Sequence, residues 1–193
     1  MSAQQLDLLK DPRCRGVWKP PYRYLYEKWW TEDGARVLYI MLNPSDGTPH
    51  KPDPTMRQCI GFAQSHGFGG LEIVNLYGLL TSKPTELKKT ARSNLQHAIG
   101  PENSTYVREA IVRIAKRAEE ERLRDGSSRS RVVLAWGAQA SKTRGGEEQV
   151  SGVRVVVASL NEITALCFGQ NKDRSPIHPL MLPGDTRMVP YLW

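Results

Sequence analysis

Three apolar runs divide the chain, at residues 36–42 (RVLYIML), 71–77 (LEIVNLY) and 131–137 (RVVLAWG). Within each run, apolar residues largely follow one another without the regular polar alternation of a half-exposed strand. Such runs, rich in β-branched and aromatic residues, are typical of strands that are buried on both faces. The pattern therefore predicts three core strands.

The segments between these strands carry two helical patterns. After the first strand, Asp53 and Pro54 indicate a helix start, with Asp53 as the N-cap and Pro54 at the first helical position. This helix is predicted to stop at Gly67. A second, basic and amphipathic helix is predicted over 104–126, where apolar residues recur at helical spacing: Val107, Ile111, Ile114 and Ala118.

Strands that alternate with helices indicate an α/β fold. We predict a three-layer α/β/α sandwich around a central, mainly parallel sheet. The chain of 193 residues is long enough for one such domain with a full core, so residues 1–193 are assigned to a single domain. Its residues 1–35 form an aromatic and basic N-terminal segment, which is expected to pack on the sheet or its edge. The alternative is that the aromatic side chains of this segment stack on bases.

Three other segments are less regular. Residues 78–103 form a polar connection, and residues 141–152 (SKTRGGEEQVSG) are expected to be flexible. Residues 153–169 fit two interpretations, because their β-branched run favours a strand while their length allows a helix followed by a short strand at 165–168.

Composition narrows the class of protein. The hydrophobic share of 39% and the charged share of 24% are those of a folded globular chain. No apolar run is long enough to cross a membrane and the N-terminus lacks the apolar core of a signal peptide, so the protein is expected in the cytoplasm. The net charge of +7 favours polyanionic partners.

Cysteine and histidine spacing argues against disulfides and metals. The three cysteines are scattered and are expected to be reduced thiols: Cys14, Cys59 and Cys167. The histidines lack ligand spacing with one another: His50, His66, His97 and His178. We therefore expect no metal and no cofactor.

Polar side chains stand where the predicted strands end. Asn43, Pro44 and Ser45 follow the first strand, Asn75 lies near the end of the second, and His178 lies in a proline-flanked loop near the C-terminus. In parallel sheets, ligands bind beyond the carboxyl ends of the strands. Two amides and an imidazole at that edge suit a neutral, planar ligand with amide-like groups, such as the edge of a nucleobase.

The order of these motifs resembles that of the uracil-DNA glycosylase superfamily. The matching segments are MLNPS (41–45), EIVNLY (72–77), VVLAWGAQA (132–140) and IHPLML (177–182). Over most of its length the chain more closely resembles a family from bacteria and their viruses with the signature MLNPS...DPT.R.C..FA...G..G..+VNL...HPL. That second family has no established function. This resemblance therefore identifies related proteins but does not indicate a reaction.

The glycosylase resemblance implies roles for the matching residues. Asn43 would hold or orient the attacking water, and Asn75 would hydrogen-bond the edge of a flipped-out base. His178 would donate to a base carbonyl oxygen and stabilise negative charge on the leaving base. Leu180 or Met181 would be the apolar wedge that fills the gap left in the duplex.

The chain also departs from the superfamily pattern. Ser45 replaces the glycine of the first motif, and Leu180 replaces the serine of the last. The cysteines that hold an iron–sulfur cluster in some branches are missing. Position 43 is not the water-activating aspartate, which implies a slow hydrolase unless Asp46 or Asp53 substitutes.

Two charged residues near the first motif have alternative interpretations. Asp53 is favoured as a helix cap, because a capping carboxylate held in its ionised form is a poor general base. The alternative is that it faces the pocket and acts on water. Arg57, one turn further on, could face the same opening and hold a phosphate or carboxylate, although an exposed helical arginine needs no ligand.

Three functions follow from this reasoning. The first is a nucleobase-directed enzyme of uracil-DNA-glycosylase-like type, a hydrolase that cleaves a base from DNA or a nucleotide, or a base-modifying enzyme. The second is a non-catalytic module of the same fold that binds nucleic acid, DNA ahead of RNA, or a free nucleotide. The third is an adaptor whose aromatic N-terminal segment contacts a protein partner.

Overall fold

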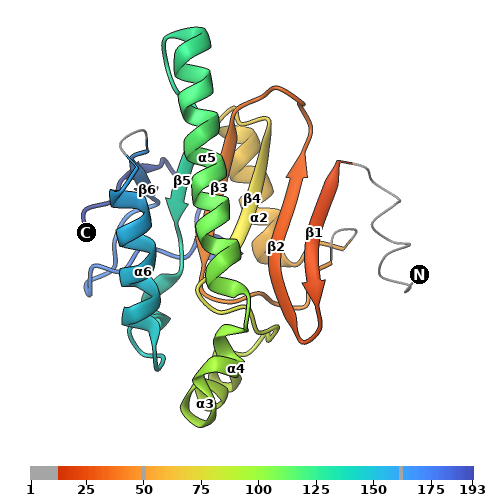
Figure 1. Cartoon of the computed structure of the whole chain (residues 1–193), viewed down its shortest axis with the longest axis vertical. Helices are drawn as coiled ribbons and strands as arrows, with labels where there is room; N and C mark the ends of the chain where they lie inside the picture. Colours follow the sequence, from red (N-terminus) through yellow and green to blue (C-terminus); the bar gives the residue numbers. More distant parts are fainter. Residues whose placement is uncertain (1–12, 49–50, 161–162) are drawn as a thin grey trace.

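A seven-stranded mixed sheet forms the centre of the computed structural model, which describes residues 13–48, 51–160 and 163–193 (Figure 1). Residues 1–12 of the N-terminal segment, His50, and positions 161–162 lie outside the described residues. The strands follow the order β1-β2-β4-β3-β5-β6-β7 across the sheet. Their bounds are β1 Cys14–Lys19, β2 Tyr22–Trp29, β3 Arg36–Met41, β4 Gly70–Asn75, β5 Arg131–Leu134, β6 Ala165–Cys167 and β7 Val189–Pro190.

The parallel part of the sheet is confined to its centre. Strands β4, β3, β5 and β6 are mutually parallel, whereas β2 is antiparallel to β4, β1 to β2, and β7 to β6. The prediction of an α/β fold is confirmed, but the sheet is mixed rather than mainly parallel. The difference arises toward the edges of the sheet, where antiparallel strands need no helical crossover.

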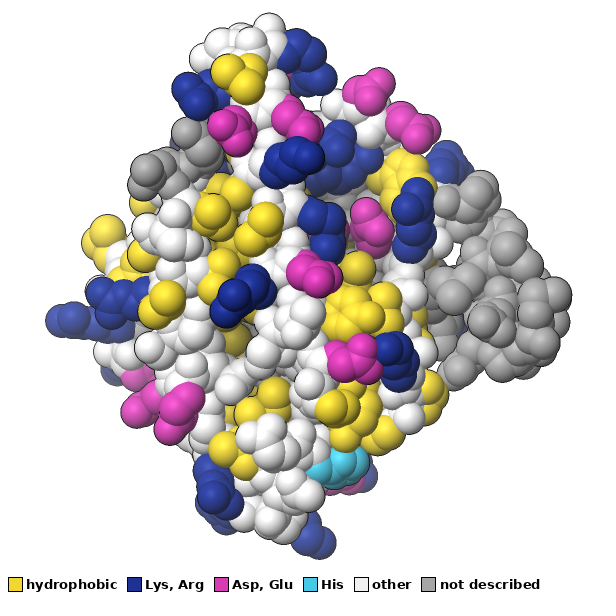
Figure 2. Space-filling model, viewed as in Figure 1, with side chains coloured by type: hydrophobic (Ala, Val, Ile, Leu, Met, Phe, Trp, Pro, Cys, Tyr) yellow, Lys and Arg dark blue, Asp and Glu magenta, His cyan; other side chains and the backbone are white. Residues whose placement is uncertain are grey.

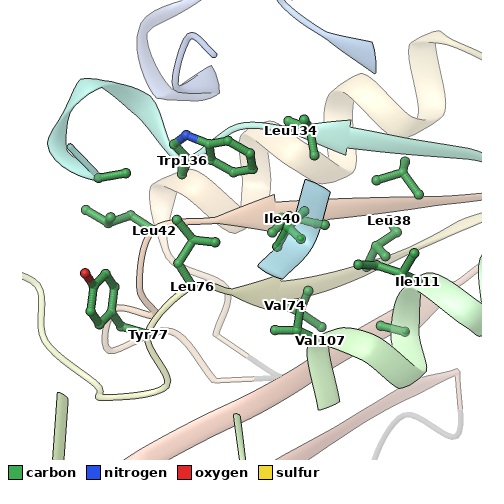
Figure 3. Packing of buried hydrophobic residues seen from close by; sticks show 14 of the residues in the cluster. Leu38, Ile40, Leu42, Val74, Leu76, Tyr77, Val107, Ile111, Leu134 and Trp136 are labelled. Carbon is green, nitrogen blue, oxygen red and sulfur yellow. The ribbon is translucent and has the colours of Figure 1, made fainter. Parts of the chain in front are cut away.

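Helices cover both faces of this sheet. Helix α2 (Pro54–Ser65) lies on one face, and α5 (Asn103–Asp125) and α6 (Gly146–Ala158) lie on the other (Figure 1). Strand β3 alternates between the two layers: Leu38 and Ile40, with Leu42 just after the strand, belong to the cluster under α5 and α6, and the remaining apolar side chains of β3 belong to the cluster under α2. Figure 3 shows the first cluster, in which Val107 and Ile111 of α5 pack over Leu38, Ile40 and Val74.

Both predicted helices are present. Helix α2 begins after Asp53, whose side chain accepts a hydrogen bond from the Met56 backbone N–H, and it ends just before Gly67, which has a φ of 77°. Helix α5 ends at Gly126 in the left-handed conformation, and its predicted apolar positions are buried. Figure 2 shows basic and acidic side chains interspersed over α5, so this face does not gather the positive charge into one patch.

The N-terminal segment contributes two strands of the sheet itself. Strands β1 and β2 form a hairpin that turns at the cis peptide Pro20–Pro21, and β2 pairs with β4. Tyr24 and Tyr26 have no exposed surface. The aromatic side chains at these two positions therefore fill the core instead of standing free for bases or a protein partner.

Two of the three less regular segments contain helical residues that were not predicted, and the third matches one of its two interpretations. The polar connection contains α3 (Pro84–Ser93) and α4 (Leu95–Ile99). The prediction of a flexible tract is wrong from residue 146 on, because α6 begins there. Of the two interpretations of 153–169, the helix followed by a short strand is correct, with α6 ending at Ala158 and β6 spanning Ala165–Cys167.

The described residues also show the state of the cysteines and the character of the helices. The side chains of Cys14, Cys59 and Cys167 are buried, and no two of these three cysteines are joined in a disulfide. Across residues 13–48, 51–160 and 163–193, no helix has the length and apolar character needed to traverse a lipid bilayer.

Candidate functional site

A cavity of about 390 Å³ lies where the central strands end. The chain leaves β3 toward β4 on one side and leaves β5 toward β6 on the other, so the crevice between β3 and β5 is a topological switch point, the usual ligand position in open α/β sheets. The lining residues come from β2, β3, β4, α2, the turn after β5 and the loop around His178. The polar ones are Arg23, Asn43, Ser45, Asp53, Thr55, Asn75, Ser82, Gln139 and His178.

Asn75 is the most unusual of these residues. Its side chain lines the cavity and the residue is only 1% exposed. Neither Oδ1 nor Nδ2 has a hydrogen-bond partner in the structure. A buried amide without partners costs about 1–3 kcal/mol per unsatisfied group, so this side chain is kept at an energetic disadvantage. Such an amide offers one donor and one acceptor to a ligand.

Asn43 is held in one orientation at the cavity wall. Its Nδ2 donates to the backbone oxygen of Thr81 at 2.7 Å and to that of Pro44 at 3.1 Å. No residue in the described part of the chain donates to its Oδ1. The amide oxygen is therefore the group that Asn43 offers to water or to a ligand.

His178 approaches the end of β5 through its loop. Gly137 has a φ of 71°, and a Cβ at this position would lie 3.2 Å from the Cβ of His178, so a glycine allows both the turn and the close approach. The Nδ1 of His178 accepts from the Leu180 backbone N–H at 3.3 Å, and burial lowers its pKa below the ordinary value. The neutral ring therefore carries its proton on Nε2, where it can donate into the cavity.

Asp53 is a helix cap that also belongs to the cavity wall. One carboxylate oxygen accepts from the Met56 backbone N–H at 2.8 Å, and the other accepts from the Ser45 hydroxyl at 2.5 Å. The cap that the sequence favoured is confirmed. The same carboxylate fixes Ser45, so the two residues form one unit at the entrance to α2.

We expect Asp53→Ala to lower the free energy of unfolding by about 1 kcal/mol, because the cap of α2 is lost. Asp53→Asn should stay within a few tenths of a kcal/mol of the wild type, since asparagine caps about as well. Urea unfolding at pH 7 measures both. Equal losses in the two variants would show that the cap does not set the stability of α2.

A pH dependence follows from the burial of His178. Its folded-state pKa is lowered, chiefly by burial and partly offset by Asp53, from the ordinary 6.5. Below about pH 6.5 the unfolded chain therefore binds this proton more readily than the folded protein, and the free energy of unfolding falls as the pH decreases. Between pH 7.5 and 5.5 the wild type should lose more stability than His178→Asn, which has no such titration. Parallel urea-unfolding series check this, and equal losses would contradict it.

The other predicted residues do not all line the cavity. Leu180 lines the cavity and is 38% exposed, and its neighbour Met181 is 89% exposed. Arg57 does not line the cavity: it is exposed and donates to the Pro52 backbone oxygen, which corrects the expectation that it faces the opening. Pro44 is buried next to the cavity, and its carbonyl accepts from Asn43 and from the Thr81 backbone N–H.

Thr55, Ser82, Gln139 and Arg23 line the cavity but were not predicted as site residues, and Arg23 is the one of them that carries a charge. It comes from β2, in a segment expected to cover the sheet, and it is only 3% exposed. One sequence signal indicates its location. Arg23 lies between two aromatic residues in the segment YRY, and this segment forms part of the core.

Metal ligands are not gathered in this cavity. Among the residues that the structure describes, no three His, Cys, Asp or Glu side chains are grouped as a metal site. The polar side chains of the cavity are instead three amides, three hydroxyls, an imidazole, a guanidinium and one carboxylate, a set that suits an organic ligand that forms directional hydrogen bonds.

Comparisons with known proteins give a family for the chain. No curated protein and no solved structure matches it. The family model described as "Protein of unknown function (DUF1643)" matches residues 23–180, which is well over half of the chain. The chain therefore belongs to the DUF1643 family.

Proposed function

We propose that the cavity binds a nucleobase and that the protein cleaves the N-glycosidic bond of that base in DNA or in a nucleotide. One observation carries the proposal: the amide of Asn75 is buried in the cavity wall with both of its polar atoms unpartnered. A bound base supplies the missing donor and acceptor in a single planar edge.

The arrangement around Asn75 supports the same reaction. Asn43, Asn75 and His178 line one cavity, as expected if the motifs that resemble the uracil-DNA glycosylase superfamily act together. The central parallel strands, with helices on both faces, agree with the three-layer fold predicted from the sequence. Leu180 lines the cavity and Met181 is strongly exposed, so both are accessible for the proposed role of an apolar wedge.

The chemistry uses groups that the geometry leaves available. Oδ1 of Asn43 accepts a hydrogen bond from a water molecule whose oxygen attacks the anomeric carbon. The bond between that carbon and the base nitrogen breaks, and its electron pair leaves with the base. Nε2–H of His178 donates to an acceptor atom of the base on which negative charge develops, and the proton of the attacking water passes to solvent.

A second candidate is a binding module without chemistry. Both carboxylate oxygens of Asp53 already accept hydrogen bonds, from Met56 and Ser45, so this carboxylate is a weak candidate for activating water. The proposed hydrolase therefore relies on orienting water and stabilising the leaving base, and a slow reaction is expected.

Base release from oligonucleotides tests the proposal. Single- and double-stranded substrates carry uracil, hypoxanthine, hydroxymethyluracil or normal bases, and abasic sites are scored by alkaline cleavage. We expect release of at least one base by the wild type and its loss in Asn43→Ala. Asn94→Ala is the matched control, because Asn94 also bonds to backbone, as the cap of α4, but does not line the cavity.

The outcomes separate the two candidates. Release that Asn43→Ala abolishes and Asn94→Ala retains supports the enzyme. Binding without release, lost in Asn75→Leu, supports the module. The nucleobase proposal fails if neither binding nor release occurs with the oligonucleotides or with free nucleosides.

A further inference from the structure

Arg23 lies at the inner wall of the cavity as a buried cation. Its Nη1 lies 3.2 Å from the Gly47 backbone oxygen, to which it donates, and 3.3 Å from the Met56 sulfur. Its Nε is buried and has no hydrogen-bond partner in the structure. No carboxylate of the described residues forms an ion pair with it within 4.0 Å. The guanidinium thus keeps an unmet donor beside the cavity.

A β-bulge aims this side chain at the cavity. In the β1–β2 ladder Val17 pairs with Leu25 while the next residue, Trp18, pairs with Arg23, so Tyr24 is an extra residue without a partner. One inserted residue moves the side chains of the residues beyond it to the opposite face of the sheet. Tyr24 accordingly stacks on Tyr106 of α5, whereas Arg23 contacts Met56 of α2 on the opposite face of the sheet.

The charge of Arg23 persists in this environment. Burial lowers its pKa to about 10, with Asp53 opposing the change, so the side chain stays protonated at neutral pH. Buried charges are ordinarily paired or fully hydrogen-bonded. The face of the Trp18 ring, 5.8 Å away, offers only partial compensation. A ligand with acceptor atoms at this point would supply the missing partner.

The position of Arg23 limits which part of a ligand can reach it. Across the sheet, Arg23 on β2 lies one strand beyond Asn75 on β4, which in turn lies beside β3. His178 stands on the far side, next to Gly137 after β5. Neighbouring strands lie about 4.8 Å apart. A ligand that contacts both His178 and Arg23 must therefore be longer than one that contacts only His178 and Asn75.

Because Arg23 is 3% exposed, a backbone phosphate of a polynucleotide, which stays at the cavity mouth, is an unsuitable partner. The ligand group that accepts hydrogen bonds from Arg23 must therefore lie at the inner end of the ligand. In a flipped-out nucleotide this inner end is the base.

We propose that Arg23 selects a 6-oxopurine, the class that includes guanine and hypoxanthine. The guanidinium donates to O6 and N7 of the purine, the pairing by which arginine recognises guanine, and Oδ1 of Asn75 accepts from the adjacent N1–H. Adenine places an amino donor against the guanidinium, and a pyrimidine lacks the second ring. This inference rests on the proposed function and adds the identity of the base to it.

Binding of free nucleosides tests the selection. The full chain is titrated with guanosine, inosine, adenosine and uridine, and with ribose 5-phosphate as a phosphate probe, by isothermal calorimetry. We expect guanosine and inosine to bind about 10- to 100-fold more tightly than adenosine or uridine, the range that a bidentate contact provides. Arg23→Met should reduce the preference to threefold or less.

Two further variants keep the test decisive. Arg15→Met is the matched control, because Arg15 also lies on a tryptophan ring, Trp29, in the same hairpin but outside the cavity. It should retain the full preference. Arg23→Lys keeps a cation but not the planar pair of donors, so it should lose the preference even if Arg23→Met fails to fold.

The failures of the two proposals are distinguishable. If nucleosides bind through Asn75 but guanosine shows no preference over adenosine, the selection by Arg23 is overturned while the nucleobase function stands. Arg23-dependent binding of ribose 5-phosphate as tight as that of guanosine assigns Arg23 to a phosphate and also overturns the selection. If no nucleoside binds and no base is released, both proposals fall.

Discussion

Replacing Asn75 with leucine is expected to raise the free energy of unfolding by about 1–3 kcal/mol and to abolish nucleobase binding. The gain arises because leucine, similar in shape to asparagine, removes two buried polar atoms that have no partner in the structure. The loss of binding arises because leucine can neither donate nor accept. Urea unfolding and nucleoside titration measure the two effects on the same preparation.

Asn103→Leu is the matched control for this substitution. Asn103 is also fully buried and its Oδ1 has no hydrogen-bond partner in the structure, but its Nδ2 donates to the backbone oxygens of Asn75 and Leu76 at 2.9 and 3.1 Å, which the substitution would leave without this donor. Its replacement should therefore destabilise the protein by about 1–3 kcal/mol. Equal destabilisation by the two substitutions would mean that the Asn75 amide has a partner in solution, and a stable Asn75→Leu variant that binds normally would remove Asn75 from the site.

Replacing His178 with asparagine is expected to slow base release by about 10²–10³-fold, the usual effect of removing one donor to developing negative charge. An asparagine oxygen can still accept from the Leu180 N–H, as Nδ1 of His178 does, but no donor remains at the place of Nε2. His178→Gln places an amide N–H nearer to that point and should retain more activity than His178→Asn. Single-turnover rates at pH 7.5 give the comparison.

The protonation state of His178 predicts the pH profile of base release, and the Gln and Asn variants distinguish a donor from a structural role. Because burial lowers the pKa of His178, the ring is neutral at pH 7 and donates as an imidazole. A rate that depends on this neutral donor should be flat between pH 7 and 8. If His178→Gln and His178→Asn lose activity equally while keeping the stability of the wild type, donation from Nε2 is not part of the reaction.

The central fold was predictable because its signals are local. Strand β3 is apolar on both faces, so it is buried whichever way it is turned, and the cap at Asp53 uses residues adjacent in sequence. Helix α3 escaped prediction because it buries only Leu87 and Ala91. Helix α6 was obscured by its glycines: a Cβ on Gly146 would lie 1.9 Å from the Ala140 backbone oxygen, so this glycine serves close packing rather than flexibility.

The site was predictable where its residues follow parallel strands. Asn43 and Asn75 could be grouped because strand ends converge in any open α/β sheet, whereas His178, in a loop after β6, was grouped with them through the order of the sequence motifs. Arg23 could not, because its direction depends on the bulge at Tyr24, and the extra residue is visible only in the pairing of β1 with β2. An arginine in an aromatic, charged segment otherwise resembles a surface residue.

The pairing of β2 with β4 links this site to the solubility of the protein. Every residue of β4 is buried, and β2 covers the backbone edge that β4 would otherwise expose. A strand of this kind with an open edge is a template for pairing with other chains. Detaching the hairpin would therefore remove Arg23 from the cavity and create an aggregation-prone edge at once. Variants that loosen the hairpin should therefore aggregate. Such variants should not persist as folded proteins that bind a different ligand.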